Sequence, residues 1–375
     1  MGRSNGTAIG VGLIGCGFVT RDRHLPALNH VPHLRVVAVA DSNPVAARDL
    51  SERWHIDRCY SDAQQLLDDA AVEAVAICVP APFHVEIALA ALQAGKHVLV
   101  EKPIALSLGD ADRLIEEAER TSARALMGFN LRWHPLIRQA RRALKEGRVG
   151  PVVHIRTTFS DPLLTQDKVV PPWRIERGLG GGALLDKAVH HFDLWRFLLD
   201  DEVEEVFALS RSEHGDDDTV TVTARTSGGV LATALAADTT SVHNEVSIFG
   251  EAGELSVCCY RFDGLTLNSV SELPGRPRAR LRGLARSAVQ LGASLGVARR
   301  GGIFAASYEA EWRHFAAVVR ADAEPECRLE DGREALAVAL AAARSAATGE
   351  PIRVADELEV VTPVRRIPVA DRRAP

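Results

Sequence analysis

Three side chains suited to proton transfer lie far apart in this sequence: Lys102, Asp186 and His190. Lys102 follows an apolar run at 97–100 and precedes Pro103, which cannot donate to a sheet ladder and therefore ends a strand there. In an open parallel sheet the carboxyl ends of the strands are where ligands bind. A lysine fixed at that position can polarise a hydroxyl or carbonyl oxygen of a bound molecule.

Asp186 and His190 lie in a segment that begins with glycines at 180–182 and continues with helical spacing to about residue 199. Asp186 is four residues before His190 and Asp193 is three residues after it, so we expect one helical stripe. A histidine flanked by carboxylates suits removal of a proton from an alcohol. The alternative is a polar helix face with a capping aspartate and a hydrogen-bonded histidine. We expect His191, further around the helix, to pack inside or against a partner subunit.

A glycine turn follows the first apolar run, at 9–14. Gly15 suits the tight turn, and Gly17 lets backbone N–H groups approach a pyrophosphate at a helix N-terminus. Thr20 stands at the third glycine position of this fingerprint. The next apolar run ends in Asp41, about where an acid accepts the ribose hydroxyls of a dinucleotide. Together they predict a dinucleotide site, whereas the alternative is an ordinary turn in which Asp41 caps a helix.

The carboxylate of Asp41 also predicts which dinucleotide binds. It repels a 2′-phosphate, and residues 42–44 offer no cation, so NAD is favoured over NADP. NADP stays possible if a nearby arginine turns toward the phosphate: Arg21, Arg23 or Arg48.

The elements that must position these residues fall into two patterns. Apolar runs at 9–14, 34–40, 74–79, 97–100 and 125–129 alternate with helical spacing at 46–54, 63–67, 84–94 and 108–121. This alternation predicts an α/β Rossmann domain with a doubly wound parallel sheet over residues 1–130. Strand patterns then follow at short spacing, at 152–159, 203–210, 219–226, 230–236, 244–249 and 254–259. They predict an α+β domain over 131–358 with a large, mainly antiparallel open sheet.

Composition limits the class of protein. The 375 residues carry a net charge of −6 and 46% hydrophobic residues, which indicates a globular protein and argues against nucleic-acid binding. We expect no membrane span and no metal, since the six cysteines lack zinc spacing, and the polar start predicts no secretory signal. Cytoplasmic, reduced thiols are expected. The segment 276–302, with seven arginines, is either a cationic amphipathic helix or a surface excursion, and we expect a poorly ordered tail at 359–375.

With these motifs the chain resembles the glucose-fructose oxidoreductase/inositol dehydrogenase (Gfo/Idh/MocA) family. The resemblance spans about residues 8 to 355 and rests on the glycine turn, Glu101-Lys102-Pro103, the segments 128–132 and 345–349, Trp173-Arg174 and the run from 180 to 193. It implies an NAD(P)-dependent oxidoreductase. Such an enzyme transfers a hydride between nicotinamide and a secondary alcohol or ketone of a sugar, cyclitol or nucleotide-linked sugar.

The resemblance also implies site residues. The catalytic residues would be Lys102, Asp186 and His190. The cofactor would contact Gly15, Gly17, Phe18, Val19, Asp41, Pro80, His84, Glu101 and Lys102, with Glu101 holding the strand end. The substrate would contact Lys102, Arg132, Trp173, Arg174, Asp186, Lys187 and His190. The second domain's sheet would form a homodimer or homotetramer.

Two departures from the family pattern bear on the site. Thr20 replaces a glycine and could loosen the pyrophosphate turn. Lys187 stands where an apolar residue is more usual. It is either a lysine paired with an acid of a neighbouring element or, with Arg132 or Arg174, a ligand for an anionic substrate group.

Two other functions are compatible with these residues. One is a nucleotide-binding regulatory protein on the same fold, which would be expected to lose the lysine or the histidine. The other is a lyase or glycosidase that uses NAD without net turnover. The sequence leaves open the exact substrate, the direction of reaction and whether His190 or Lys102 is the immediate base.

Overall fold

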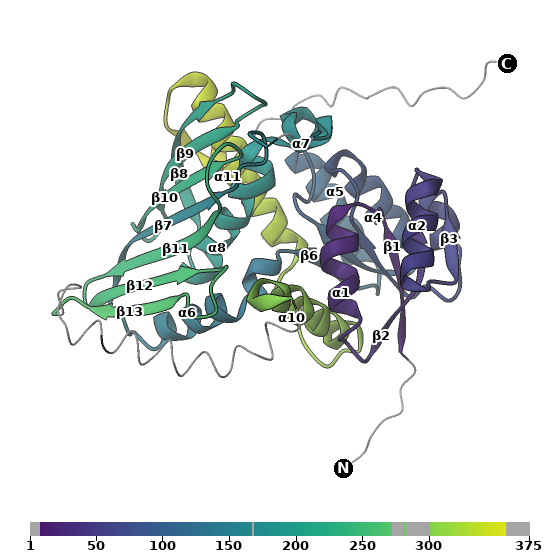
Figure 1. Ribbon diagram of the computed structural model, residues 1–375. Helices are drawn as coiled ribbons and strands as arrows, with labels where there is room; N and C mark the ends of the chain where they lie inside the picture. Colours follow the sequence, from purple (N-terminus) through teal and green to yellow (C-terminus); the bar gives the residue numbers. More distant parts are fainter. Residues whose placement is uncertain (1–7, 167–168, 272–280, 282–300, 358–375) are drawn as a thin grey trace, which may run out of the picture.

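The computed structural model describes residues 8–166, 169–271, 281 and 301–357 (Figure 1). Its first sheet has six parallel strands in the order β3-β2-β1-β4-β5-β6. They are β1 (Ile9–Ile14), β2 (Leu34–Ala40), β3 (Arg58–Tyr60), β4 (Ala74–Ile77), β5 (His97–Glu101) and β6 (Ala125–Gly128). The doubly wound sheet predicted from the apolar runs is thereby confirmed. The strand order reverses between β1 and β4, so the crevice beyond their carboxyl ends is where a ligand binds.

Short helical segments connect these strands. They are η1 (Thr20–His24), α1 (Leu25–Leu28), α2 (Pro44–Trp54), α3 (Ala63–Leu67), η2 (Ala81–Phe83), α4 (His84–Gln93) and α5 (Leu108–Arg120). Asn43 caps α2 and Ser107 caps α5, each accepting hydrogen bonds from the first turn. The sequence pattern missed η1, α1 and β3.

The second sheet has eight strands in the order β13-β12-β11-β7-β10-β9-β8-β14. They are β7 (Val152–Ser160), β8 (Val203–Arg211), β9 (Thr219–Thr226), β10 (Leu231–Ala237), β11 (His243–Gly250), β12 (Gly253–Cys258), β13 (Leu265–Ser269) and β14 (Ile352–Arg353). The mainly antiparallel sheet is confirmed, but β7 and β10 pair in parallel. Their parallel pairing brings the residues that follow them, Asp161 and Asp238, to the same edge.

Helices cover one face of this sheet (Figure 1). They include α6 (Pro135–Lys145), α8 (Val189–Leu199) and α11 (Leu329–Thr348), with η3 (Asn130–Trp133), α7 (Pro172–Ile175), η4 (Arg177–Leu179), η5 (Leu184–Ala188) and α12 (Val354–Glu357) nearby in the chain. In β9 the residues Val220 and Val222 are buried, whereas Thr221 and Thr223 are exposed. One face of the sheet therefore lies on the core and the other faces solvent.

One late helix, α10 (Gly302–Val319), packs on the first sheet's side of the molecule, next to α1 (Figure 1). Its Tyr308, Trp312 and Phe315 share a hydrophobic cluster with Val11 and Leu13 of β1. Burying three aromatic side chains stabilises this contact by several kcal/mol, at roughly 25 cal/mol per Å² of apolar surface. A late part of the chain thus supports the dinucleotide-type sheet.

Two sequence predictions fall largely beyond what the structure describes. The arginine-rich segment 276–302, apart from residues 281, 301 and 302, and the tail 359–375 lie outside the described residues. Among the helices that are described, none combines the length and apolarity that crossing a bilayer requires.

Candidate active site

The glycine turn beyond β1 contains two glycines with different requirements. Gly15 has φ +97°, and a Cβ there would come within 2.3 Å of the Cys78 carbonyl oxygen, so the fold itself demands glycine. A Cβ at Gly17 would meet none of the described atoms within 4 Å. Gly17 therefore presents open backbone to solvent, which is the surface that a pyrophosphate could approach.

Thr20 closes this turn rather than loosening it. Its side chain is fully buried, and its hydroxyl donates to the Gly15 carbonyl oxygen at 2.5 Å. Thr20 also begins the π-helical segment η1, so the chain leaves the turn without a regular α-helical start. The hydroxyl thus does locally what close packing of a third glycine does in the usual fingerprint.

Asp41 lies beside the turn at the end of β2. Its Oδ2 accepts the Cys16 N–H at 2.7 Å and its Oδ1 accepts the Asn43 N–H at 2.8 Å. Each carboxylate oxygen keeps a lone pair for a ribose hydroxyl. The carboxylate is therefore held in place before a ligand arrives.

Two of the arginines that could recognise NADP have other partners. Arg21 pairs with Asp22 at 2.6 Å, and the Arg23 guanidinium lies 5.3 Å from the Phe18 ring and 5.6 Å from the Phe304 ring. These contacts reduce their availability for a 2′-phosphate. Phe18 is 54% exposed at the turn, and Val19 is half-buried.

Replacing Asp41 by alanine should weaken NADH binding about tenfold and improve NADPH binding, because a ribose acceptor and a charge facing the phosphate both disappear. Fluorescence titration with both cofactors measures this change. Asp57→Ala is the control, since it removes an exposed carboxylate elsewhere. A wild-type protein that already prefers NADPH would show that the NAD assignment is wrong.

A buried hydrogen-bonded chain supports the end of β5. The Lys102 N–H donates to Glu101 Oε2 at 3.1 Å, and His24 Nε2 lies 3.0 Å from Glu101 Oε1. Trp312 Nε1 donates to His24 Nδ1 at 3.0 Å. Because His24 Nδ1 accepts this bond, its Nε2 carries the proton that it donates to Glu101. Glu101 thereby holds the strand end, and α10 helps to fix it.

His84 lies between the ends of β4 and β5 and is buried. Its Nδ1 is 2.7 Å from the Pro103 carbonyl oxygen and its Nε2 is 2.7 Å from the Val79 carbonyl oxygen. The sequence placed His84 and Pro80 at the cofactor. The structure gives His84 a supporting position, with both ring nitrogens engaged by the backbone, and leaves Pro80 half-buried at the start of η2.

Lys102 and Asp186, separated by 84 residues, meet at this strand end. Lys102 Nζ donates to Asp186 Oδ1 and to the Asp186 carbonyl oxygen, both at 2.8 Å, while Arg174 Nη2 lies 3.3 Å from Asp186 Oδ2. Burial by itself would raise the pKa of Asp186, but Lys102 and Arg174, with Lys187, hold that pKa well below its usual range. Both side chains keep some exposure, 17% and 15%, so a small molecule can reach them.

His190 lies at the start of α8, between the rings of Phe129 and Phe159, each 5.9 Å away. Burial and then Lys102 hold the pKa of His190 well below its usual value. Its Nδ1 is buried without a hydrogen-bond partner among the described residues. The imidazole is therefore neutral near pH 7 and able to accept a proton.

The helical stripe expected around His190 is interrupted. Asp186 lies in η5, a π-helical segment in which the Val189 N–H bonds to the Leu184 carbonyl oxygen, so spacing by four does not apply. Asp193 is fully buried and binds Arg132 at 2.6 Å. The expected pairing of His190 with two carboxylates is thus replaced by aromatic packing and by Lys102.

Two predicted substrate residues lie elsewhere. Arg132 is 4% exposed and is held by Asp193 and, at 2.9 Å, by Asp331, so the expected substrate contact is replaced by a buried ion pair. Lys187 is 2% exposed and pairs with Asp238, which matches the ion-paired alternative and not the anion-binding one. Trp173 is 41% exposed and stands next to Arg174.

His191 packs inside, as expected. It is 1% exposed, and its Nε2 lies 3.3 Å from Asn244 Oδ1 on β11.

Comparison with known proteins identifies the family. Residues 9–129 match the model described as "Oxidoreductase family, NAD-binding Rossmann fold", and residues 137–256 match the "GFO/IDH/MocA C-terminal domain". This chain belongs to the Gfo/Idh/MocA oxidoreductase family. The resemblance inferred from the motifs is confirmed, and so is the assignment of the first domain to a family that binds NAD.

Individual family members share a quarter to a third of their residues with the chain. Myo-inositol 2-dehydrogenase of Thermotoga maritima is 32% identical over 59% of this chain and 66% of that protein. The 1,5-anhydro-D-fructose reductase of Ensifer adhaerens is 29% identical over 92% of this chain and 98% of that protein. The structure of a levoglucosan dehydrogenase in complex with NADH and L-sorbose superimposes with a TM-score of 0.79 at 22% identity, covering 92% of this chain and 98% of that one.

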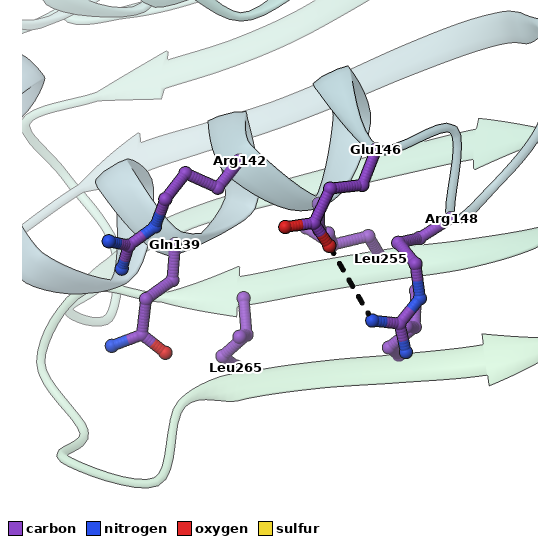
Figure 2. A pocket seen from close by; sticks show the side chains of 8 residues that line it. Gln139, Arg142, Glu146, Arg148, Leu255 and Leu265 are labelled. Atoms are coloured by element: carbon purple, nitrogen blue, oxygen red, sulfur yellow. Dashed lines mark ion pairs between the residues drawn. The ribbon is translucent and has the colours of Figure 1, made fainter.

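Surface hollows do not mark this Gfo/Idh/MocA site. A hollow of about 510 Å³ lies between α6 and strands β12 and β13, where Leu255 and Leu265 are overhung by Arg142, Glu146 and Arg148 (Figure 2). A second, of about 360 Å³, lies among charged side chains that include Arg132 and Asp331. Of the predicted site residues, Arg132 alone lines either hollow, and it is the one already engaged in the buried ion pair. In the described part of the chain no cluster of three metal-ligating side chains occurs.

Sequence reasoning missed two acids that border the site of this family member, Asp161 and Asp238. Each directly follows a predicted strand, which is a usable signal. Their significance depends on the parallel pairing of β7 with β10, which places both beside Lys187.

Proposed function

We propose that the protein is an NAD-dependent dehydrogenase or reductase that acts on a secondary alcohol or ketone of a neutral sugar or cyclitol. The contact of Lys102 with Asp186 at the end of β5, in the crevice beside an open glycine turn, carries this proposal. The cations Lys102, Arg174 and Lys187 are balanced by three carboxylates: Asp161, Asp186 and Asp238. This balance favours a neutral polyol over the nucleotide-linked sugar that the sequence also allowed.

The residues present fit a dinucleotide. The space in front of Gly17, which a Cβ would fill, admits a pyrophosphate, and Asp41 offers acceptors to a ribose. When bound, NAD supplies or accepts the hydride. Lys102 donates a hydrogen bond to the substrate oxygen and is oriented by Asp186. His190 takes the hydroxyl proton in the direction of oxidation and returns it in the direction of reduction.

The names of two family members support this substrate class, since one is an inositol dehydrogenase and the other a reductase of an anhydro-sugar. Absorbance at 340 nm tests the proposal with a panel of inositols, hexoses, anhydro-sugars and nucleotide-linked sugars. We expect net NADH formation or consumption with at least one neutral substrate. Conversion without net NADH change would indicate the lyase or glycosidase alternative, and NADH binding without conversion would indicate a regulatory protein.

We also propose that the enzyme works in the cytoplasm as a homodimer or homotetramer. All six cysteines are free thiols, which suits a reducing compartment. The uncovered sheet face carries exposed apolar side chains, among them Val153, Leu209 and Leu231, which suit a subunit contact. Sedimentation velocity of the full chain distinguishes these assemblies from a monomer.

A further inference from the structure

Lys187 is a buried cation surrounded by acids. It is 2% exposed, contacts Asp238 closely, and its Nζ lies 3.4 Å from Asp161 Oδ1 and 3.8 Å from Asp186 Oδ2. Burying an ammonium is costly unless carboxylates compensate it, and here one ammonium serves three of them. One of those three is the carboxylate that holds Lys102.

The two outer acids are fixed by the backbone and not by Lys187. The Asp161 N–H donates to the Ala237 carbonyl oxygen at 3.1 Å, and Asp161 Oδ1 accepts the Leu163 N–H at 3.0 Å. The Asp238 N–H donates to the Asp218 carbonyl oxygen at 2.8 Å. Asp238 is 2% exposed, and burial raises its pKa to about 6, so near pH 7 it is ionised next to Lys187. Without the ammonium, these carboxylates would stay in place and repel Asp186.

We propose that Lys187 is a positioning residue, whose ammonium offsets Asp161 and Asp238 and so keeps the Asp186 carboxylate available to Lys102. This inference rests on the proposed function. The charged and titratable groups around the ammonium are Asp186 beside it, Asp161 after β7, Asp238 after β10, Arg174 on α7, Lys102 after β5, and His190 and His191 on α8. Removing one positive charge leaves this cluster with an unbalanced negative charge.

That extra negative charge acts in the same direction on both catalytic titrations. It favours the protonated form of Asp186 and the protonated form of His190, so both pKa values rise. Activity that needs an ionised Asp186 and a neutral His190 is then lost at higher pH than in the wild type. A purely structural ion pair, by contrast, would change thermal stability and leave the pH profile where it was.

The test compares Lys187→Met, Asp238→Asn and the double variant, using the pH profile of kcat/KM with the substrate found by the panel. We expect Lys187→Met to move the acid limb upward by about one to two pH units. Asp238→Asn should leave it at or below its wild-type position, because the remaining ammonium is less neutralised. The double variant, which removes one charge of each sign, should lie close to the wild type.

Arg333→Met is the control, because it breaks a partly buried ion pair with Asp112 on α5, away from the site. It should leave the profile unchanged. NMR titration of the His190 ring gives a readout that needs no substrate, so it decides the role of Lys187 even if no substrate is found and the proposed function fails. If Lys187→Met does not fold, Asp238→Asn decides, since the proposal requires His190 to titrate at lower pH. Coincident acid limbs, or an unchanged His190 titration, would overturn the proposal.

Discussion

Replacing Lys102 by methionine is expected to lower kcat by about 10²- to 10⁴-fold, the usual effect of losing a group that assists proton transfer. Methionine keeps the length and the apolar stem of the side chain but cannot donate the two hydrogen bonds to Asp186. NADH binding should persist, because the glycine turn and Asp41 do not depend on the ammonium. Initial rates at 340 nm measure the first effect, and fluorescence titration measures the second.

Lys96→Met is a matched control for Lys102. Lys96 lies just before β5, at the opposite end of the same strand, and its ammonium donates to the backbone carbonyls of Val72 and Asp69 at 2.7 and 3.2 Å. Its loss should lower stability slightly and leave kcat near the wild-type value. Near-normal turnover in Lys102→Met would remove this lysine from the mechanism.

Much of the first domain could be predicted from sequence because its strands are buried on both faces. A parallel strand covered by helices on each side is a continuous apolar run, and the runs at 9–14 and 34–40 coincide with β1 and β2. The site elements that follow such strands, the glycine turn, Asp41 and Lys102, could be placed for the same reason. The three-residue strand β3 escaped because two of its residues are exposed.

The second domain was predictable as a sheet but not as a pairing. Alternation shows that a strand has one covered face, and it does not show which strand lies beside it. The parallel pairing of β7 with β10 is therefore invisible in the sequence, and with it the meeting of Asp161, Asp238 and Lys187. The π-helical turn at Asp186 was missed because the sequence argument assumed α-helical spacing across 186–193.

Polar contacts over long sequence separations were also beyond the sequence. Arg132 and Asp193 each look like surface or site residues, yet each is the partner that makes burial of the other possible. His24 reaches Trp312 across 288 residues, in a helix whose pattern only says that one face is apolar. Such pairs depend on where packed elements meet, which local spacing does not encode.

Replacing Gly17 by valine should weaken NADH binding by about 100-fold, equivalent to about 2.8 kcal/mol at 1.4 kcal/mol per tenfold change. The added side chain would meet none of the described atoms within 4 Å, so the protein should fold normally. It would instead fill the space in which backbone N–H groups of the turn approach a pyrophosphate. Fluorescence titration of the folded variant with NADH measures the loss.

The matched control is Gly109→Val in α5. Gly109 is exposed, and an added Cβ there also meets no described atom within 4 Å, so both variants have the same steric freedom and differ in whether a cofactor is expected in front of them. Gly109→Val should lose some helix stability and bind NADH as the wild type does. Gly15→Val is a poorer test, because its positive φ and the Cys78 carbonyl oxygen would disturb the fold as well. If folded Gly17→Val bound NADH with unchanged affinity, the dinucleotide would have to lie elsewhere, and the proposed hydride transfer beside Lys102 would lose its geometric basis.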